Sequence, residues 1–129
     1  MELVAVVILL ALLQFVAFAF LVGGARGRYK VEAPATTGHP VFERYFRVQQ
    51  NTLEQLVVLV PSMWLFGLYV SPIWAATLGV VYMVGRIVYL QSYVKDPKKR
   101  SAGFGLSFLP VVVLVIGALW GAGSRYFGG

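Results

Sequence analysis

The sequence contains no cysteine and a single histidine, His39. Without cysteine the chain forms no disulfides and has neither thiolate metal ligands nor a cysteine nucleophile. One histidine makes a histidine-based metal site implausible, so no metal is expected. The sequence also lacks a glycine-rich phosphate loop and the pattern of a serine triad.

Charged residues are also scarce. They make up 12% of the 129 residues, against about 25% in an average soluble domain, whereas 59% of the residues are hydrophobic. The mean hydropathy is +0.77. This composition indicates an integral membrane protein, and the length leaves room for a single domain, residues 1–129.

Four apolar stretches cover residues 3–22, 48–70, 73–94 and 104–120. About 20 helical residues cross the roughly 30 Å hydrocarbon layer. Helices are expected because every backbone polar group must be satisfied within its own segment. Only two residues separate the second stretch from the third, which predicts a tight antiparallel hairpin. The sequence therefore predicts an all-α integral membrane protein, a bundle of four transmembrane helices.

The formal net charge is +6, and the basic residues are unevenly distributed. The first connection contains Arg26, Arg28, Lys30, Arg44 and Arg47, and the third contains Lys95, Lys98, Lys99 and Arg100. The second connection has none. The positive-inside rule then places the first and third connections in the cytoplasm and both termini outside. Basic residues beside apolar runs favour membrane lipids or an anionic ligand as partners, and not nucleic acid.

Strongly polar residues recur at helical spacing in and before the second stretch. Arg44, Arg47, Asn51 and Glu54 are three or four residues apart, so they share one face of a helix. Hydrocarbon does not solvate such groups, which therefore face a bundle interior or a polar cavity. Arg47, Asn51 and Glu54 are either a ligand site or an interhelical polar cluster that stabilises the bundle. Arg44 is expected to pair or to contact lipid head groups at the membrane interface.

A second polar face contains Arg86, Tyr89 and Tyr93, with Arg100 a little further on. Both polar ends point to the same side of the membrane because the two helices are antiparallel. Guanidinium groups hold carboxylates, and a carboxylate pairs with an ammonium. This inventory matches a small zwitterion with excess negative charge, such as glutathione, although phosphate-bearing lipids also suit the arginines. A structural role for Arg86, as partner of Glu54 or of a helix carbonyl, is equally open.

Two runs resemble the signatures of the MAPEG family, the membrane-associated proteins in eicosanoid and glutathione metabolism. Residues 36–54 contain the pattern E-R-x-x-R-x-Q-x-N-x-x-E between Glu43 and Glu54. Residues 85–93 resemble the second signature of the family, in its third helix. The resemblance covers nearly the whole chain, including its length, its four apolar stretches and its basic connections.

The resemblance implies a single four-helix membrane domain that assembles as a homotrimer, with glutathione bound between neighbouring subunits. It implies a membrane-bound glutathione S-transferase of the bacterial, microsomal type, with glutathione as co-substrate and no metal. Glutathione-dependent peroxidase activity is a further expectation. The second substrate would be a hydrophobic electrophile or a lipid hydroperoxide that arrives from the bilayer.

The resemblance also assigns residues. Arg47, Asn51 and Glu54 would bind glutathione, with Gln49 as a supporting polar contact. Arg26 matches a family arginine at the glutathione pocket.

Three further residues follow from the third helix and the connection after it. Tyr89 and Tyr93 would contact glutathione from the third helix of a neighbouring subunit. Arg100 matches the arginine that some members use to stabilise the thiolate, so it is the first candidate for a catalytic residue.

The chain departs from the leukotriene-synthase branch of the family at two positions. That branch has two adjacent arginines at the end of the first helix, whereas the order here is Arg26-Gly27-Arg28. Arg28 is therefore only the second candidate for a catalytic arginine. Gln55 stands where that branch has a tyrosine. A general glutathione transferase is expected in preference to a leukotriene synthase.

Two other functions remain open at this point. One is a non-catalytic, lipid-binding scaffold, because the family includes such a member. The other is a small multidrug transporter, which is also built from four short spans. That class places its key glutamate in the first span, where this chain has only Gln14 as a polar residue.

Overall fold

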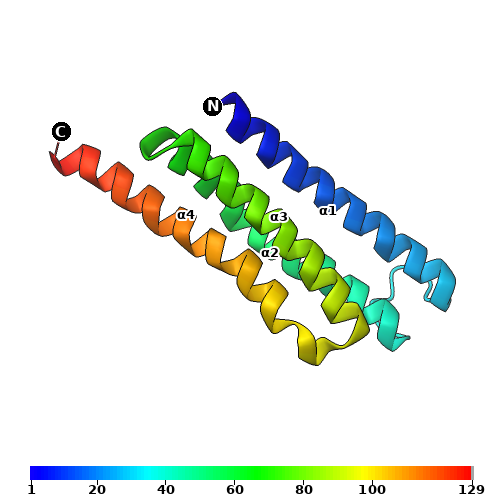
Figure 1. Ribbon diagram of the computed structural model, residues 1–129. Coiled ribbons are helices and arrows are strands. Elements are labelled where there is room, and N and C mark those ends of the chain that lie inside the picture. The colour runs from blue at the N-terminus through cyan, green and yellow to red at the C-terminus, as the bar shows by residue number, and fades with distance from the viewer. Residues whose placement is uncertain (129) are drawn as a thin grey trace.

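The computed structural model describes residues 1–128 as four long helices joined by short connections (Figure 1). The helices are α1 (Glu2–Tyr29), α2 (Pro40–Tyr69), α3 (Pro72–Lys95) and α4 (Ser101–Gly128), with the short 3-10 helix η1 (Pro97–Lys99) before α4. No strand occurs in this part of the chain. All four long helices are long and apolar enough to cross a membrane. The predicted all-α, four-helix membrane architecture is confirmed.

The helices extend beyond the apolar stretches that predicted them. For example, α4 contains 28 residues, whereas the apolar stretch covers only residues 104–120. An apolar stretch marks the part of a helix in hydrocarbon, while backbone hydrogen bonds carry the helix further. The starts of α2 and α3 follow local signals. Pro40 and Pro72 occupy the first turn, where a missing N–H is tolerated, and the side chains of His39 and Ser71 cap that turn.

The α2–α3 hairpin forms the middle of the bundle. α1 packs against α2 and α3, and α4 packs against the same two helices. α1 and α4 therefore lie on opposite sides of the hairpin (Figure 1). The connections α1–α2 and α3–α4 lie at one end of the bundle, and the two termini lie at the other end with the α2–α3 turn.

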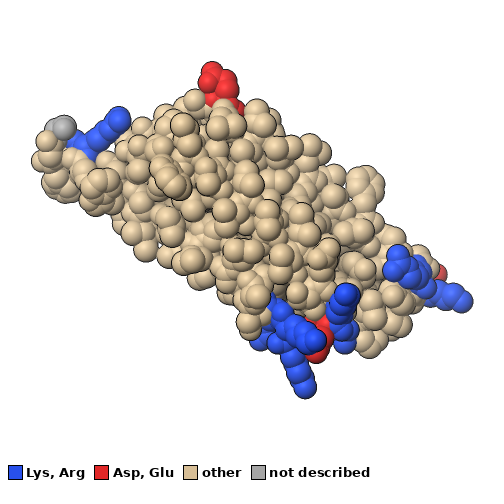
Figure 2. Space-filling view, in the orientation of Figure 1, with Lys and Arg blue, Asp and Glu red and all other residues tan. Residues whose placement is uncertain are grey.

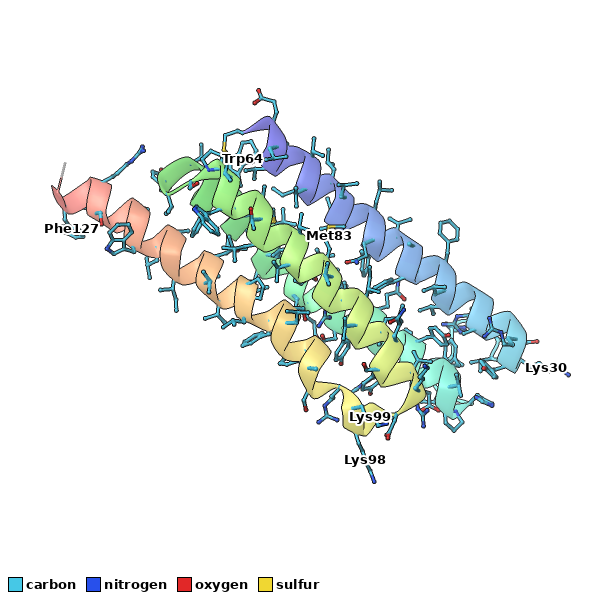
Figure 3. All side chains as sticks on the ribbon, in the orientation of Figure 1. Lys30, Trp64, Met83, Lys98, Lys99 and Phe127 are labelled. Carbon is cyan, nitrogen blue, oxygen red and sulfur yellow. The ribbon has the colours of Figure 1, made fainter. Side chains whose placement is uncertain are left out.

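The outer surface between the two ends is apolar. Leu13 on α1 and Leu119 on α4 are 61% and 72% exposed. Figure 2 shows Lys and Arg gathered at the ends of the molecule, with a broad uncharged surface between them. Lys30 and Lys98, for example, lie at the end that carries the two longer connections (Figure 3). This distribution suits a protein whose middle contacts lipid, since charge is costly there.

Two glycines bring α3 and α4 into close contact. A Cβ on Gly85 would lie 2.6 Å from the backbone nitrogen of Ser107, and a Cβ on Gly103 would collide with the backbone of Tyr89. Small residues let membrane helices approach at backbone distance. The start of α4 is therefore held against the last turns of α3.

Gly85→Ala is expected to lower the free energy of unfolding by about 1–3 kcal/mol, because the added methyl group forces α3 and α4 apart. Thermal denaturation in detergent measures the effect. The matched control is Gly123→Ala in α4, where a Cβ would meet nothing within 4 Å. Equal thermal midpoints for the two variants would contradict this interpretation of the helix contact.

Candidate functional site

A cavity of about 920 Å³ lies between α2, α3 and the start of α4, at the end of the bundle with the basic connections. It is lined by Phe46, Arg47, Gln50, Asn51, Glu54, Tyr89, Tyr93, Arg100, Ser101, Phe104 and Gly105. Its volume falls in the range of roughly 300–1,000 Å³ that is usual for small-molecule sites.

One face of α2 supplies the polar side of the cavity. Arg47, Gln50, Asn51 and Glu54 lie on it because each is three or four residues from another member. Arg44 is one turn further back on the same face but does not line the cavity. Its guanidinium donates instead to the carbonyl oxygen of Val94 at 2.9 Å, which joins the beginning of α2 to the end of α3.

Aromatic side chains form the opposite wall. The rings of Tyr89 and Tyr93 on α3 stack with their centroids 5.4 Å apart. Phe104 of α4 lies beside Tyr89, at 6.2 Å between centroids. Tyr89 is buried, at 5% exposure. The wall can therefore contact the uncharged backbone and methylene groups of a ligand.

The charged groups of the cavity are not paired with one another. Arg47, Glu54 and Arg100 are exposed and form no ion pair within residues 1–128, where the only salt bridge joins the N-terminal amine to Glu2. Of the alternative interhelical polar cluster, the structure contains only the bond between Asn51 of α2 and Arg86 of α3, and Arg47 and Glu54 form no ion pair within residues 1–128. Two cations and one carboxylate remain for a ligand.

Arg86 lies behind this face and is fully buried, at 0% exposure. Its Nη1 donates to Asn51 Oδ1 at 2.7 Å and to Thr52 Oγ1 at 3.2 Å, and its Nη2 donates to Ser107 Oγ at 2.7 Å. The expectation that Arg86 pairs with Glu54 or a helix carbonyl is therefore wrong. Side-chain oxygens of α2 and α4 accept from its two Nη atoms, because α3 packs against both of those helices.

An apolar groove continues from the cavity along α2 and α4. Its volume is about 380 Å³, and it shares Asn51, Glu54 and Phe104 with the cavity. The remaining lining residues are Gln55, Val58, Phe108, Val111, Val112, Val115 and Ile116. A molecule with a polar head and an apolar tail could occupy both spaces at once.

Six of the predicted site residues line the cavity together: Arg47, Asn51, Glu54, Tyr89, Tyr93 and Arg100. Within the chain, Tyr89 and Tyr93 lie opposite the polar face of α2, because α3 packs directly beside α2. One chain therefore supplies the charged face and the aromatic wall. The contact of Tyr89 and Tyr93 with glutathione across neighbouring subunits stays a prediction.

Arg26, Arg28 and Gln49 do not line the cavity. The two arginines belong to α1, on the far side of the α2–α3 hairpin. Arg26 donates to the carbonyl oxygen of Ala35 at 2.7 Å, and Arg28 lies over the ring of Tyr29, 5.7 Å from its centroid. Gln49 is two residues from both Arg47 and Asn51 and therefore turns away from their face.

Sequence analysis missed Phe46, Gln50, Ser101, Phe104 and Gly105. Gln50 could have been found, because it lies three residues after Arg47 and four before Glu54. The other four need the tertiary packing of α2 against α4. Among residues 1–128, no group of three or more His, Asp or Glu side chains could hold a metal ion.

Comparison with known proteins identifies the family of the chain. A model of the MAPEG family matches residues 3–120, nearly the whole chain. The chain belongs to the MAPEG family. The match spans all four helices and includes every residue that lines the cavity.

Several MAPEG relatives are similar over most of their length. Microsomal glutathione S-transferase 2 of Homo sapiens is 42% identical over 95% of this chain and 84% of that protein. An uncharacterized protein of Synechocystis sp., sll1147, is 46% identical over 89% of this chain and 84% of its own. Leukotriene C4 synthase of Bos taurus is 36% identical over 78% of this chain and 67% of that protein. At family level, these relatives associate the chain with membrane-bound glutathione transferases.

Ser107→Ala is expected to destabilise the protein by about 1–3 kcal/mol, because it leaves a buried guanidinium N–H of Arg86 without its acceptor. A thermal melt in detergent measures the change. Ser124→Ala, at an exposed position of the same helix, is the control. A loss no larger than that of the control would show that the Arg86–Ser107 bond contributes nothing to stability.

Proposed function

We propose that the protein is a membrane-bound glutathione S-transferase. The observation that carries the proposal is the cavity in which Arg47, Arg100 and Glu54 come together without pairing. The relatives that are glutathione transferases by name support it. Peroxidase activity toward lipid hydroperoxides would use the same site and the same thiolate.

The cavity matches glutathione group by group. Glutathione has two carboxylates, one ammonium and one thiol. Arg47 binds a carboxylate through its two-pronged guanidinium, and Glu54 pairs with the ammonium. Asn51 and Gln50 provide amide hydrogen bonds, and Tyr89 and Tyr93 contact the peptide from the opposite side.

Arg100 activates the thiol in this scheme. A free cysteine thiol has a pKa of about 8.5, and a neighbouring cation lowers it, because the thiolate is stabilised. Arg100 is in the connection between η1 and α4, at the edge of the cavity. Arg28 remains a second candidate for this role.

The thiolate then attacks the second substrate, whose apolar part occupies the groove between α2 and α4. With an aryl chloride, the sulfur forms a bond to carbon and chloride leaves with its electron pair. With a hydroperoxide, the sulfur attacks the terminal oxygen, the O–O bond breaks and an alcohol leaves. The resulting glutathione sulfenic acid reacts with a second glutathione to give the disulfide and water.

In a homotrimer, the predicted site residues that do not line the cavity of their own chain could reach the cavity of a neighbouring copy. Arg26, Arg28 and Gln49 are too far round the bundle to serve the cavity of their own chain, so any contact with glutathione must come from a second copy. The exposed apolar residues of α1 and α4 offer the surface for such an assembly.

The proposed location is a bacterial inner membrane, with the basic end of the bundle in the cytoplasm. The lysines and arginines of both longer connections support this orientation. Glutathione then enters the cavity from the cytoplasm, and the hydrophobic substrate enters from the bilayer.

Arg47→Ala is expected to weaken glutathione binding by about 10- to 100-fold, the loss that accompanies removal of a charged hydrogen-bond partner. Isothermal titration calorimetry in detergent measures the affinity. Arg125→Ala, at the opposite end of the bundle, should bind like the wild type. If the wild type itself binds no glutathione, or if Arg47→Ala binds it unchanged, the proposal fails.

Arg100→Gln is expected to slow conjugation of chlorodinitrobenzene about 10-fold or more near neutral pH, because the thiol pKa returns toward about 8.5. The rate of the variant should keep rising up to that pH, whereas the wild type should reach its plateau at a lower pH. Lys99→Gln, one residue away and outside the cavity, is the control. Identical pH profiles for wild type and Arg100→Gln would assign thiolate stabilisation to another group.

A further inference from the structure

Arg86 is a buried cation whose hydrogen bonds all go to uncharged groups. Its acceptors are the side-chain oxygens of Asn51, Thr52 and Ser107. No carboxylate of residues 1–128 lies within 4.0 Å of it. Its guanidinium carbon is 4.5 Å from the ring centroid of Tyr89, which lines the cavity. A neutral donor would cross-link the same helices at a smaller desolvation cost, so the position of this charge behind the cavity requires a reason.

The contact with Asn51 determines the orientation of that amide. Arginine has only donors, and an asparagine side chain has one acceptor atom, its oxygen. The 2.7 Å contact therefore requires Oδ1 to face Arg86. Asn51 also lines both the cavity and the apolar groove, and its Nδ2 donates to no group of the described chain. The NH₂ group is thus the part of Asn51 that remains for a ligand.

We infer that Arg86 is a positioning residue, which holds Asn51 as a hydrogen-bond donor toward the ligand. The inference rests on the proposed function and adds a requirement to it: the ligand must place an acceptor oxygen, from a carboxylate or a peptide carbonyl, against Asn51. Arg86 touches no ligand itself. The positive charge of Arg86 polarises the amide of Asn51. This effect is larger in surroundings of low dielectric constant, where the charge is screened less.

With Asn51 held in this orientation, hydrogen-bond donors and acceptors occupy fixed places on the polar face of the cavity. Arg47, Asn51 and Arg100 all present donors, and Glu54 is the only ionised acceptor. An anionic or carbonyl group of the ligand is favoured beside the donors, and its ammonium is favoured beside Glu54. A zwitterion can then bind in one direction only.

A double-mutant cycle separates positioning from a purely structural cross-link. Glutathione affinity is measured by calorimetry for the wild type, Arg86→Gln, Asn51→Ala and the double variant, each as the intact assembly in detergent. Each single variant should weaken binding by about fivefold or more. If Arg86 acts through Asn51, the loss in the double variant should be clearly smaller than the product of the two single losses. Losses that multiply would overturn the inference.

Asn51→Asp tests the same point without altering Arg86. Aspartate still accepts the bond from Arg86, but it presents an oxygen to the ligand where asparagine presents an NH₂ group. It should bind glutathione more weakly than Asn51→Ala, because two acceptors then face each other. Affinity equal to that of the wild type would overturn the inference. If Arg86→Gln does not assemble, the cycle is run with Arg86→Lys, and Asn51→Asp gives an independent result.

Ser107→Ala is the structural control. It removes one bond of Arg86 on the side of α4 and leaves the bond to Asn51 in place. Its thermal midpoint should fall, while its affinity for glutathione should stay within about twofold of the wild type. A wild type that binds no glutathione would refute the proposed function. A wild type that binds, combined with independent losses in the cycle, would refute only the role of Arg86.

Discussion

The whole site depends on one buried guanidinium. Arg86 of α3 is bonded to Asn51 and Thr52 of α2 and to Ser107 of α4, so three helices meet around a single side chain. The hydrocarbon layer contains no water that could replace these hydrogen bonds. Separating the helices would therefore leave all of these polar groups without partners at once. The three helices are therefore cross-linked at the level of Asn51, beside the cavity.

The cavity itself exists because the helices are close on one side and apart on another. Glycines bring α3 and α4 to backbone distance near Tyr89 and Ser107. Phe46 of α2 and Phe104 of α4 both line the space that remains beside this contact. Charged residues of α2 and of the α3–α4 connection then face a space that is open toward the polar end of the bundle, where water can solvate them.

Much of this arrangement was predictable from the sequence, and the reasons differ from residue to residue. Apolar length predicted four helices, and the 3.6-residue period predicted that Arg47, Asn51 and Glu54 share a face. The partner of Arg86 was not predictable, because the rotation of one helix against another depends on packing along its full length. The resemblance assigns Gln49 to the site, whereas the helical period favours Gln50, which lines the cavity.

Position 105 is a place where a substitution could change the size of the binding space. Gly105 lines the cavity, yet a Cβ at this position would meet no atom within 4 Å. Glycine is therefore not required there by helix packing, in contrast to Gly85 and Gly103. A larger residue at position 105 could shorten the binding space from the mouth inward and restrict the size of its ligand, while the frame of helices behind it stayed as it is.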